Sequence, residues 1–114
     1  MASELSSLFS LKGKVIVITG ASGLLGRKHA EAVAAYDGIP VLLDLSQDEL
    51  EEQAAILNQR YSVNAVGFSV NITDEIQIKN NAALLIKKFG KIDGLVNNAA
   101  NNPKVEENSE RKFS

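Results

Sequence analysis

One stretch decides the fold expected of this chain: Val15-Ile16-Val17-Ile18-Thr19-Gly20-Ala21-Ser22-Gly23-Leu24-Leu25-Gly26. Its first five residues are mostly β-branched, which predicts a strand buried on both faces. Three glycines spaced G-x-x-G-x-x-G follow at once and predict a tight turn that opens into a helix. Gly20 would permit the turn, Gly23 would leave room for a pyrophosphate against the main chain, and Gly26 would let the helix pack close to the strand.

An acidic residue at the end of the next strand supports a dinucleotide site. Asp44 closes the run Val41-Leu42-Leu43-Asp44, about 20 residues beyond the glycines, where a carboxylate binds the ribose in such sites. The free N–H groups at the start of the first helix would face the phosphates. In the alternative reading the glycines only form a compact turn, Ser22 serves that turn and Asp44 caps the strand exit. The combined spacing favours dinucleotide binding.

Composition restricts the other functions. The chain has 114 residues and a formal net charge of -2, which predicts one small domain without a broad basic patch for nucleic acid or an anionic membrane. The sequence contains no apolar run of membrane-spanning length and no secretory leader, so we expect a cytoplasmic protein. Zero cysteines and a single histidine argue against disulfides, thiolate chemistry and Cys or His metal sites.

Strands and helices are predicted to alternate along the chain. The strands are expected at 15–19, 41–44, 65–70 and 93–97, and the helices at 23–36, 46–61 and 73–89. Short connections with right-handed crossovers then give an α/β fold of Rossmann type, a parallel sheet of order 3-2-1-4 with helices on both faces. We expect residues 1–12 to be a lead-in segment, residues 13–102 the dinucleotide-binding domain and residues 103–114 a polar tail.

Details of the helices follow from residue type and spacing. Ser46 and Thr73 are expected to cap the second and third helices. Gly38 is expected to end the first helix in the left-handed conformation, and Gly90 to end the third. The first helix is expected to turn Leu25 and Tyr36 toward the core, together with Ala32 and Val33. His29 on this helix is expected to be a packed, hydrogen-bonded side chain without a catalytic role.

Three segments resemble motifs of the short-chain dehydrogenase/reductase family, whose members are NAD(P)-dependent oxidoreductases with a Rossmann fold. Residues 19–26 resemble its glycine motif, Asn71-Ile72-Thr73-Asp74 its adenine-pocket segment, and Asn97-Asn98-Ala99-Ala100 its N-N-A-G motif. The glycine spacing is nearer that of the extended members, whereas Asn97-Asn98-Ala99 is typical of the shorter ones. Asn71 replaces a usual Asp, and Ala100 replaces a usual Gly.

The resemblance assigns the cofactor-binding residues by position. The glycine loop, Gly20 to Gly26, would hold the pyrophosphate through the backbone of Ser22, Gly23, Leu24 and Leu25, and Asp44 would bind the adenosine ribose. Asn71 and Ile72 would border the adenine, and Asn98, Ala99 and Ala100 the ribose nearer the nicotinamide. A carboxylate at Asp44 repels a 2′-phosphate, and neither Ser22 nor Leu45 is basic, so NAD is favoured over NADP.

The family's Tyr-x-x-x-Lys pair is missing from the chain. Tyr36 is followed four residues later by Pro40, and Tyr61 by Ala65. The second half of such a fold is missing too, so we expect the cofactor-binding part of an oxidoreductase, inactive alone and possessing no catalytic residue. The alternatives are a non-catalytic nucleotide-binding or regulatory module and, less favoured because of Asn97-Asn98-Ala99, an S-adenosylmethionine methyltransferase. An uncovered fourth strand, with Leu95 at the edge, also predicts self-association.

Overall fold

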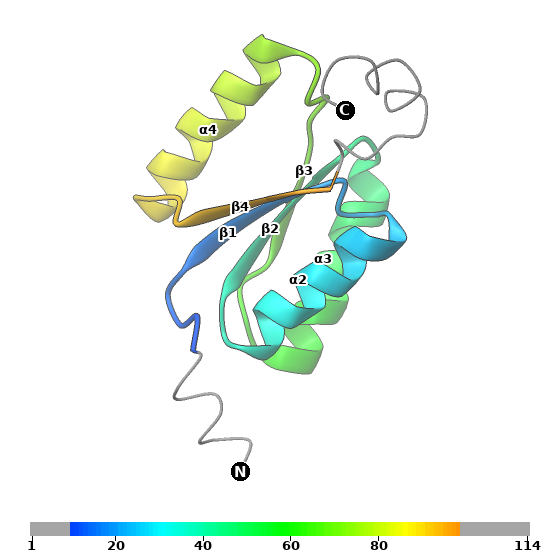
Figure 1. The fold of residues 1–114 in the computed structure, drawn as a ribbon, viewed down its shortest axis with the longest axis vertical. Coiled ribbons are helices and arrows are strands. Elements are labelled where there is room, and N and C mark those ends of the chain that lie inside the picture. Colours follow the sequence, from blue (N-terminus) through cyan, green and yellow to red (C-terminus); the bar gives the residue numbers. More distant parts are fainter. Residues whose placement is uncertain (1–9, 99–114) are drawn as a thin grey trace, which may run out of the picture.

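The computed structural model describes residues 10–98. Seven elements alternate along these residues (Figure 1): β1 Val15–Thr19, α2 Leu24–Ala35, β2 Ile39–Asp44, α3 Gln47–Tyr61, β3 Val66–Ser69, α4 Glu75–Phe89 and β4 Gly94–Asn97. The predicted order of strands and helices is confirmed, and most element ends differ from the predicted ones by one or two residues.

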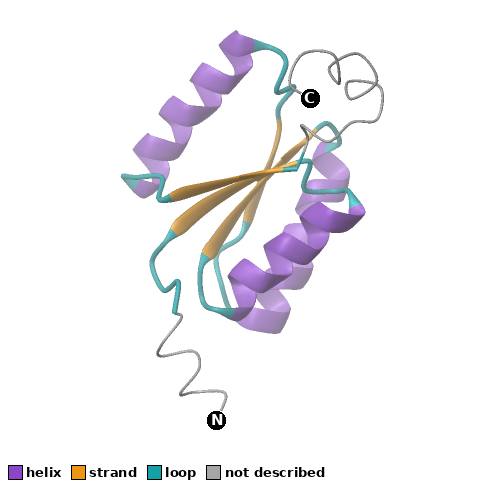
Figure 2. Cartoon of the chain, viewed as in Figure 1, coloured by secondary structure: helices purple, strands orange, loops and turns teal. Residues whose placement is uncertain are grey.

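The four strands form one parallel sheet in the order β3-β2-β1-β4, as the sequence predicts. β1 lies in the middle, with Ile18 opposite Leu42 of β2 and Val96 of β4. Helices α2 and α3 cover one face of this sheet and α4 covers the other (Figure 2). The described part is therefore a three-layer α/β arrangement of Rossmann type.

Alternate residues of β1 and β2 enter two separate cores. On the side of α2 and α3, ten buried residues pack together: Ile18, Ala21, Ala30, Val33, Ala34, Leu42, Leu50, Ala54, Leu57 and Ala65. On the side of α4 the buried cluster has six members: Val15, Val17, Val41, Leu43, Val70 and Leu85. Strands that bury both faces in this way require apolar residues at every position, which explains the unbroken β-branched run that predicted β1.

The rotation of α2 differs from the prediction. Its buried residues are Gly26, Ala30, Val33 and Ala34, whereas Leu25 and Tyr36 are 52% and 36% exposed. A Cβ atom at Gly26 would lie 2.2 Å from the Gly20 carbonyl oxygen. Because α2 touches the turn after β1 at Gly26, this residue must face the sheet. The same rotation of the helix turns Leu25 and Tyr36 toward the surface.

Two predicted helix ends are wrong and two are right. The side chain of Asp74, not that of Thr73, caps α4 by accepting from the Ile76 and Gln77 N–H groups. Asp37, not Gly38, takes the left-handed conformation after α2, at φ 72°. The expected caps are confirmed at Ser46, whose hydroxyl accepts from the Glu49 N–H, and at Gly90, where α4 ends at φ 84°.

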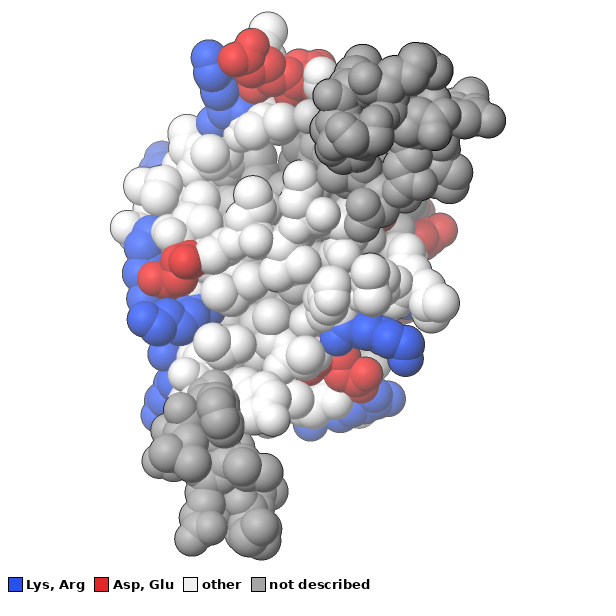
Figure 3. Space-filling view, in the orientation of Figure 1, with Lys and Arg blue, Asp and Glu red and all other residues white. Residues whose placement is uncertain are grey.

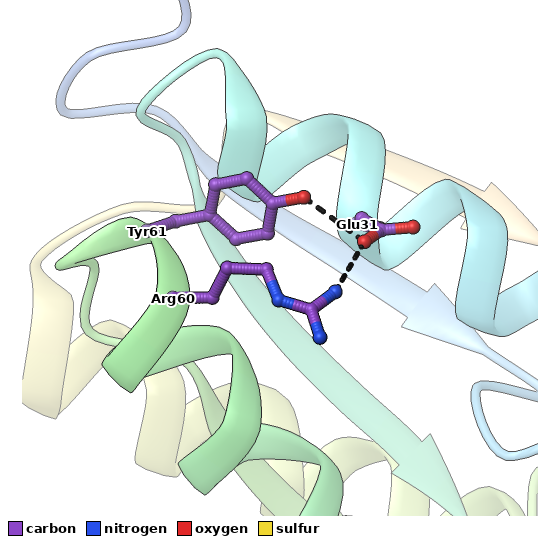
Figure 4. Close-up of polar contacts among 3 residues, drawn as sticks. All are labelled: Glu31, Arg60 and Tyr61. Carbon is purple, nitrogen blue, oxygen red and sulfur yellow. Dashed lines mark hydrogen bonds and ion pairs between the residues drawn. The ribbon is translucent and has the colours of Figure 1, made fainter.

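A polar cluster joins the outer surfaces of α2 and α3. The Glu31 carboxylate accepts from Arg60 Nη1 and from the Tyr61 hydroxyl, each at 2.9 Å (Figure 4). Two donors from one helix thus converge on a single carboxylate oxygen of the other. This contact adds a polar link between two helices that already pack together in the core.

The surface around β4 carries few charges. In the space-filling view, Lys, Arg, Asp and Glu side chains lie around the margin of the visible face and its centre is uncharged (Figure 3). Leu95 of β4 is 63% exposed. Among residues 10–98, no helix is long and apolar enough to cross a membrane.

Candidate functional site

All four parallel strands end at the same edge of the sheet, and the predicted cofactor residues lie there. The carboxyl ends are Thr19 of β1, Asp44 of β2, Ser69 of β3 and Asn97 of β4. The chain leaves β1 toward β2 on one side, while β4 lies on the other side of β1. Ligands of open α/β sheets bind outside the carboxyl ends at such a switch point.

The turn after β1 has the glycine geometry that the sequence predicts. Gly20 takes the left-handed conformation at φ 62°, and the helix packs against the turn at Gly26, where a side chain would collide with the Gly20 carbonyl. Gly23 is different, because a Cβ atom there would meet nothing nearer than the Gly20 oxygen at 3.5 Å. The packing of the protein therefore does not require a glycine at position 23. A ligand that lies against the main chain would require one, because a side chain there would occupy its space.

Gly23 is also the N-cap of α2, and no described side chain caps the helix there. The N–H groups of the first turn therefore remain for an anion, and the helix dipole favours one. Gly23 has no side chain and is exposed, so its main chain is accessible, and the side chains of Leu24 and Leu25 also lie at the surface, 78% and 52% exposed. These features fit a pyrophosphate.

The structure brings Asp44 directly against this loop. Asp44 Oδ2 accepts from the Ser22 N–H at 3.0 Å and from the Ser22 hydroxyl at 2.6 Å, and Oδ1 accepts from the Leu45 N–H at 2.9 Å. The half-buried carboxylate is thus fixed between the glycine loop and the end of β2. A carboxylate held here can accept hydrogen bonds from the hydroxyl groups of a ribose whose phosphates lie at the start of α2.

Other residues also fix the backbone of the loop. The Ala21 N–H donates to the Leu43 carbonyl at 3.1 Å, Gln53 Nε2 donates to the Ala21 carbonyl at 3.1 Å, and Arg27 Nε donates to the Ser22 carbonyl at 2.9 Å. Sequence reasoning missed Gln53 and Arg27. For Gln53 the sequence holds one signal: it comes three residues after Leu50, so helical spacing places this polar side chain on the buried face of α3.

The predicted adenine residues lie in the connection after β3. Asn71 Oδ1 accepts from both the N–H and the hydroxyl of Thr73, and the Asn71 N–H donates to Gln77 Oε1. Asn71 therefore shapes this connection with its own side chain. Ile72 is half-buried and lines a cavity of about 310 Å³ between α4 and the sheet, together with Val17, Thr19, Leu43, Ile78, Asn81, Ala82, Leu85, Ile92, Leu95 and Asn97.

The third predicted segment is only partly described. Thr19 donates its hydroxyl to Asn97 Oδ1 at 2.7 Å, which joins the carboxyl ends of β1 and β4. Asn98 follows β4 and is half-buried; its Nδ2 atom is buried without a hydrogen-bond partner within residues 10–98. The predictions for Ala99 and Ala100 lie outside the described residues.

The expectation for His29 is only half met. Its side chain is partly buried, but Nδ1 is buried without a hydrogen-bond acceptor or donor in the described part of the chain. The histidine is therefore packed as predicted, but the predicted hydrogen bonding is not met at Nδ1 within residues 10–98. It lies outside the set of groups that meet at the glycine loop.

The family model described as short chain dehydrogenase matches residues 14–114. The chain belongs to the short-chain dehydrogenase family. An NADP-dependent mannitol dehydrogenase of Alternaria alternata is 33% identical over 101 residues, which cover 86% of this chain and 38% of that protein.

Solved structures agree with the family assignment. The L-sorbose reductase of Gluconobacter frateurii, complexed with NADPH and L-sorbose, superposes with a TM-score of 0.74 at 31% identity over 78% of this chain and 34% of its own. An oxidoreductase of Haemophilus influenza with bound NAD has a TM-score of 0.72 at 28% identity over 80% of this chain and 32% of its own. The short-chain dehydrogenase chain described here thus spans about a third of the length of these relatives.

Proposed function

We propose that this chain is the NAD-binding portion of a short-chain dehydrogenase. The observation that carries the proposal is the position of the Asp44 carboxylate, 3.0 Å from the Ser22 N–H of the glycine loop. Beside it, the N–H groups in the first turn of α2 have no side-chain cap. Gly23 at the start of this turn leaves space for a ligand against the main chain. One group for the ribose and one for the phosphates therefore lie next to each other, as a dinucleotide requires.

Charge supports NAD over NADP. A 2′-phosphate on a ribose that contacts Asp44 would meet the carboxylate, and like charges at that distance repel. Neither Ser22, which contacts Asp44, nor Leu45, which follows it, is basic. The relatives include proteins named as NADP-dependent and one solved with bound NAD. The relatives therefore do not decide between the two cofactors, and the proposed preference for NAD rests on the Asp44 carboxylate.

We propose further that the complete enzyme transfers hydride between the nicotinamide and an alcohol or carbonyl group, such as that of a sugar. Support comes from the relatives named for mannitol and L-sorbose. Tyr36 and Tyr61 lack a lysine four residues later, so the chain by itself should bind cofactor without turning over substrate. The bound cofactor would supply the hydride, and residues of this chain would hold it at the edge of the sheet.

Titration with NAD and NADP tests the proposal. The unmodified chain should bind NAD more tightly than NADP, and Asp44→Asn should lower NAD affinity about tenfold and reduce the preference, because a charged acceptor is replaced by a neutral one. Asp48→Asn, an exposed carboxylate in the first turn of α3, is the control and should bind as the unmodified chain does. Binding of S-adenosylmethionine without NAD binding would refute the proposal.

We also propose self-association along β4. Within residues 10–98 this strand pairs only with β1, and Leu95 and Ile92 beside it are 63% and 38% exposed. An open strand edge with apolar neighbours favours pairing with another chain. Sedimentation velocity should show species larger than a monomer, and a stable monomer at all concentrations would contradict the proposal.

A further inference from the structure

Gln53 is a buried polar residue on an otherwise apolar helix face. It is 6% exposed and lies on α3 among the buried residues Leu50, Ala54 and Leu57. Its Nε2 atom donates to the Ala21 carbonyl at 3.1 Å, and its Oε1 atom is buried without a partner in the described part of the chain. A buried amide that satisfies only one of its two ends costs folding free energy.

The single bond of Gln53 goes to the glycine loop. Ala21 is fully buried and stands between Gly20, which makes the turn, and Ser22, which contacts Asp44. On its other side, the Ala21 N–H is held by the Leu43 carbonyl. Both backbone polar groups of Ala21 are therefore hydrogen-bonded: its carbonyl to Gln53 of α3 and its N–H to Leu43 of β2.

The position of Ala21 determines where the ligand groups lie. Without the Gln53 bond, the Ala21 carbonyl would lose the only side-chain donor that reaches it from α3, and the Ser22 N–H next in the chain could move relative to Asp44. A site binds its ligand more weakly when the loop must first be ordered. We infer that Gln53 is a positioning residue for the cofactor: it holds the Ala21 peptide so that the loop and Asp44 are arranged before NAD binds.

This inference rests on the proposed function, and its test uses two matched variants of the full chain. Gln53→Met keeps the length of the side chain and removes its amide. Asn58→Leu removes an amide from the same helix, one that bonds to the N–H and carbonyl of Ala65 at 2.6 and 3.0 Å. Ala65 precedes β3 and lies at the opposite edge of the sheet from the loop.

NAD titration, thermal unfolding and hydrogen exchange are measured on both variants. Gln53→Met should weaken NAD binding about five- to tenfold, the value of one lost hydrogen bond, and should increase exchange of the Ser22 amide. Its melting temperature should change less than that of Asn58→Leu, because loss of the unpaired Oε1 offsets the lost bond. Asn58→Leu should melt earlier and bind NAD as the unmodified chain does.

The outcomes separate the inference from the proposed function. If the unmodified chain binds NAD, and Gln53→Met binds within twofold of it with unchanged Ser22 exchange, the inference is overturned. Equal weakening in both variants would also overturn it, since the effect would then follow stability and not the loop. If the unmodified chain does not bind NAD, the proposed function fails, and the Ser22 exchange rate alone decides whether Gln53 positions the loop.

Discussion

On one face of the sheet, α2 and α3 bury eight residues between them, from Gly26 to Leu57; on the other face, α4 buries only Leu85. The two helices of the first face are joined by the Glu31 cluster, and the pocket between them measures only about 140 Å³. The second contains a cavity of about 310 Å³ lined by α4 and the strands. α4 also leaves Ile78, Leu84 and Ile86 more than 40% exposed.

This difference shows where the candidate site obtains its rigidity. The groups that fix the glycine loop come from β2 and from the well-packed side: Leu43, Asp44, Gln53 and Arg27. The loosely covered face contributes Ile72 and the connection around Asn71. We therefore expect the proposed phosphate and ribose parts of the site to be ordered before binding, and the order of the proposed adenine part to depend on how firmly α4 is held.

The largest effect is expected where α2 touches the glycine loop. Gly26→Ala places a Cβ atom 2.2 Å from the Gly20 oxygen and should cost about 3 kcal/mol or more, since backbone cannot yield as a side chain does. Gly23→Ala, with its nearest contact at 3.5 Å, should leave the melting temperature almost unchanged and weaken NAD binding. Circular dichroism melts and NAD titration check both variants; equal melting temperatures would contradict this account.

Truncation of the central leucine on each face compares the two cores directly. Leu50→Ala removes a fully buried side chain from the α3 side and should cost about 3 kcal/mol; Leu85→Ala, 1% exposed beside an existing cavity, should cost about 2 kcal/mol. Hydrogen exchange should show α4 opening alone in Leu85→Ala and the whole sheet weakened in Leu50→Ala. The reverse order of unfolding free energies would mean that α4, not α3, dominates stability.

A smaller effect is expected from the cluster that joins α2 to α3. Glu31→Gln removes the charge that accepts from Arg60 and Tyr61 and should cost about 0.5 to 1 kcal/mol, because the ion pair is largely exposed and screened by salt. Glu75→Gln, which breaks an exposed pair with Lys79 on α4 alone, is the control and should cost less. Urea unfolding at low and high salt measures both; a cost that is independent of salt would exclude an electrostatic contribution.

The smallest effect is a pH dependence at the start of β4. The Val15 N–H donates to Asp93 Oδ2 at 2.8 Å, and this bond, with help from Lys91 and Lys14 and against partial desolvation, lowers the pKa of Asp93. The folded state therefore gains stability above the usual carboxyl pKa of about 4 and loses it as pH falls through the lower folded value. Melting temperatures below pH 4 should fall less steeply in Asp93→Asn than in the unmodified chain or in exposed Glu52→Gln.

Much of the fold follows from local patterns that are visible in the sequence. Apolar runs at Val15–Thr19 and at 41–44, separated by residues with helical spacing, predict the parallel sheet and its order. Details that depend on close packing were predicted less well. The size and apolar character of Leu25 predict that it lies inside, but the contact at Gly26 determines the rotation of α2 and leaves Leu25 exposed. Asp74 replaces Thr73 as the cap because α4 begins at Glu75, which places Asp74 directly before the first helical residue and Thr73 in the preceding turn.

The sequence by itself determined the class of the chain: a strand, a glycine turn and a helix, followed at the right distance by Asp44, specify a dinucleotide-binding sheet because each of these requirements is local. Only the tertiary structure showed that Arg27 and Gln53 hold the loop in place, and that α4 buries only Leu85 on its face of the sheet. Those contacts join residues that are far apart along the chain or placed by helix rotation. Their partners are chosen by the packing of whole elements against one another, which no single stretch of sequence encodes.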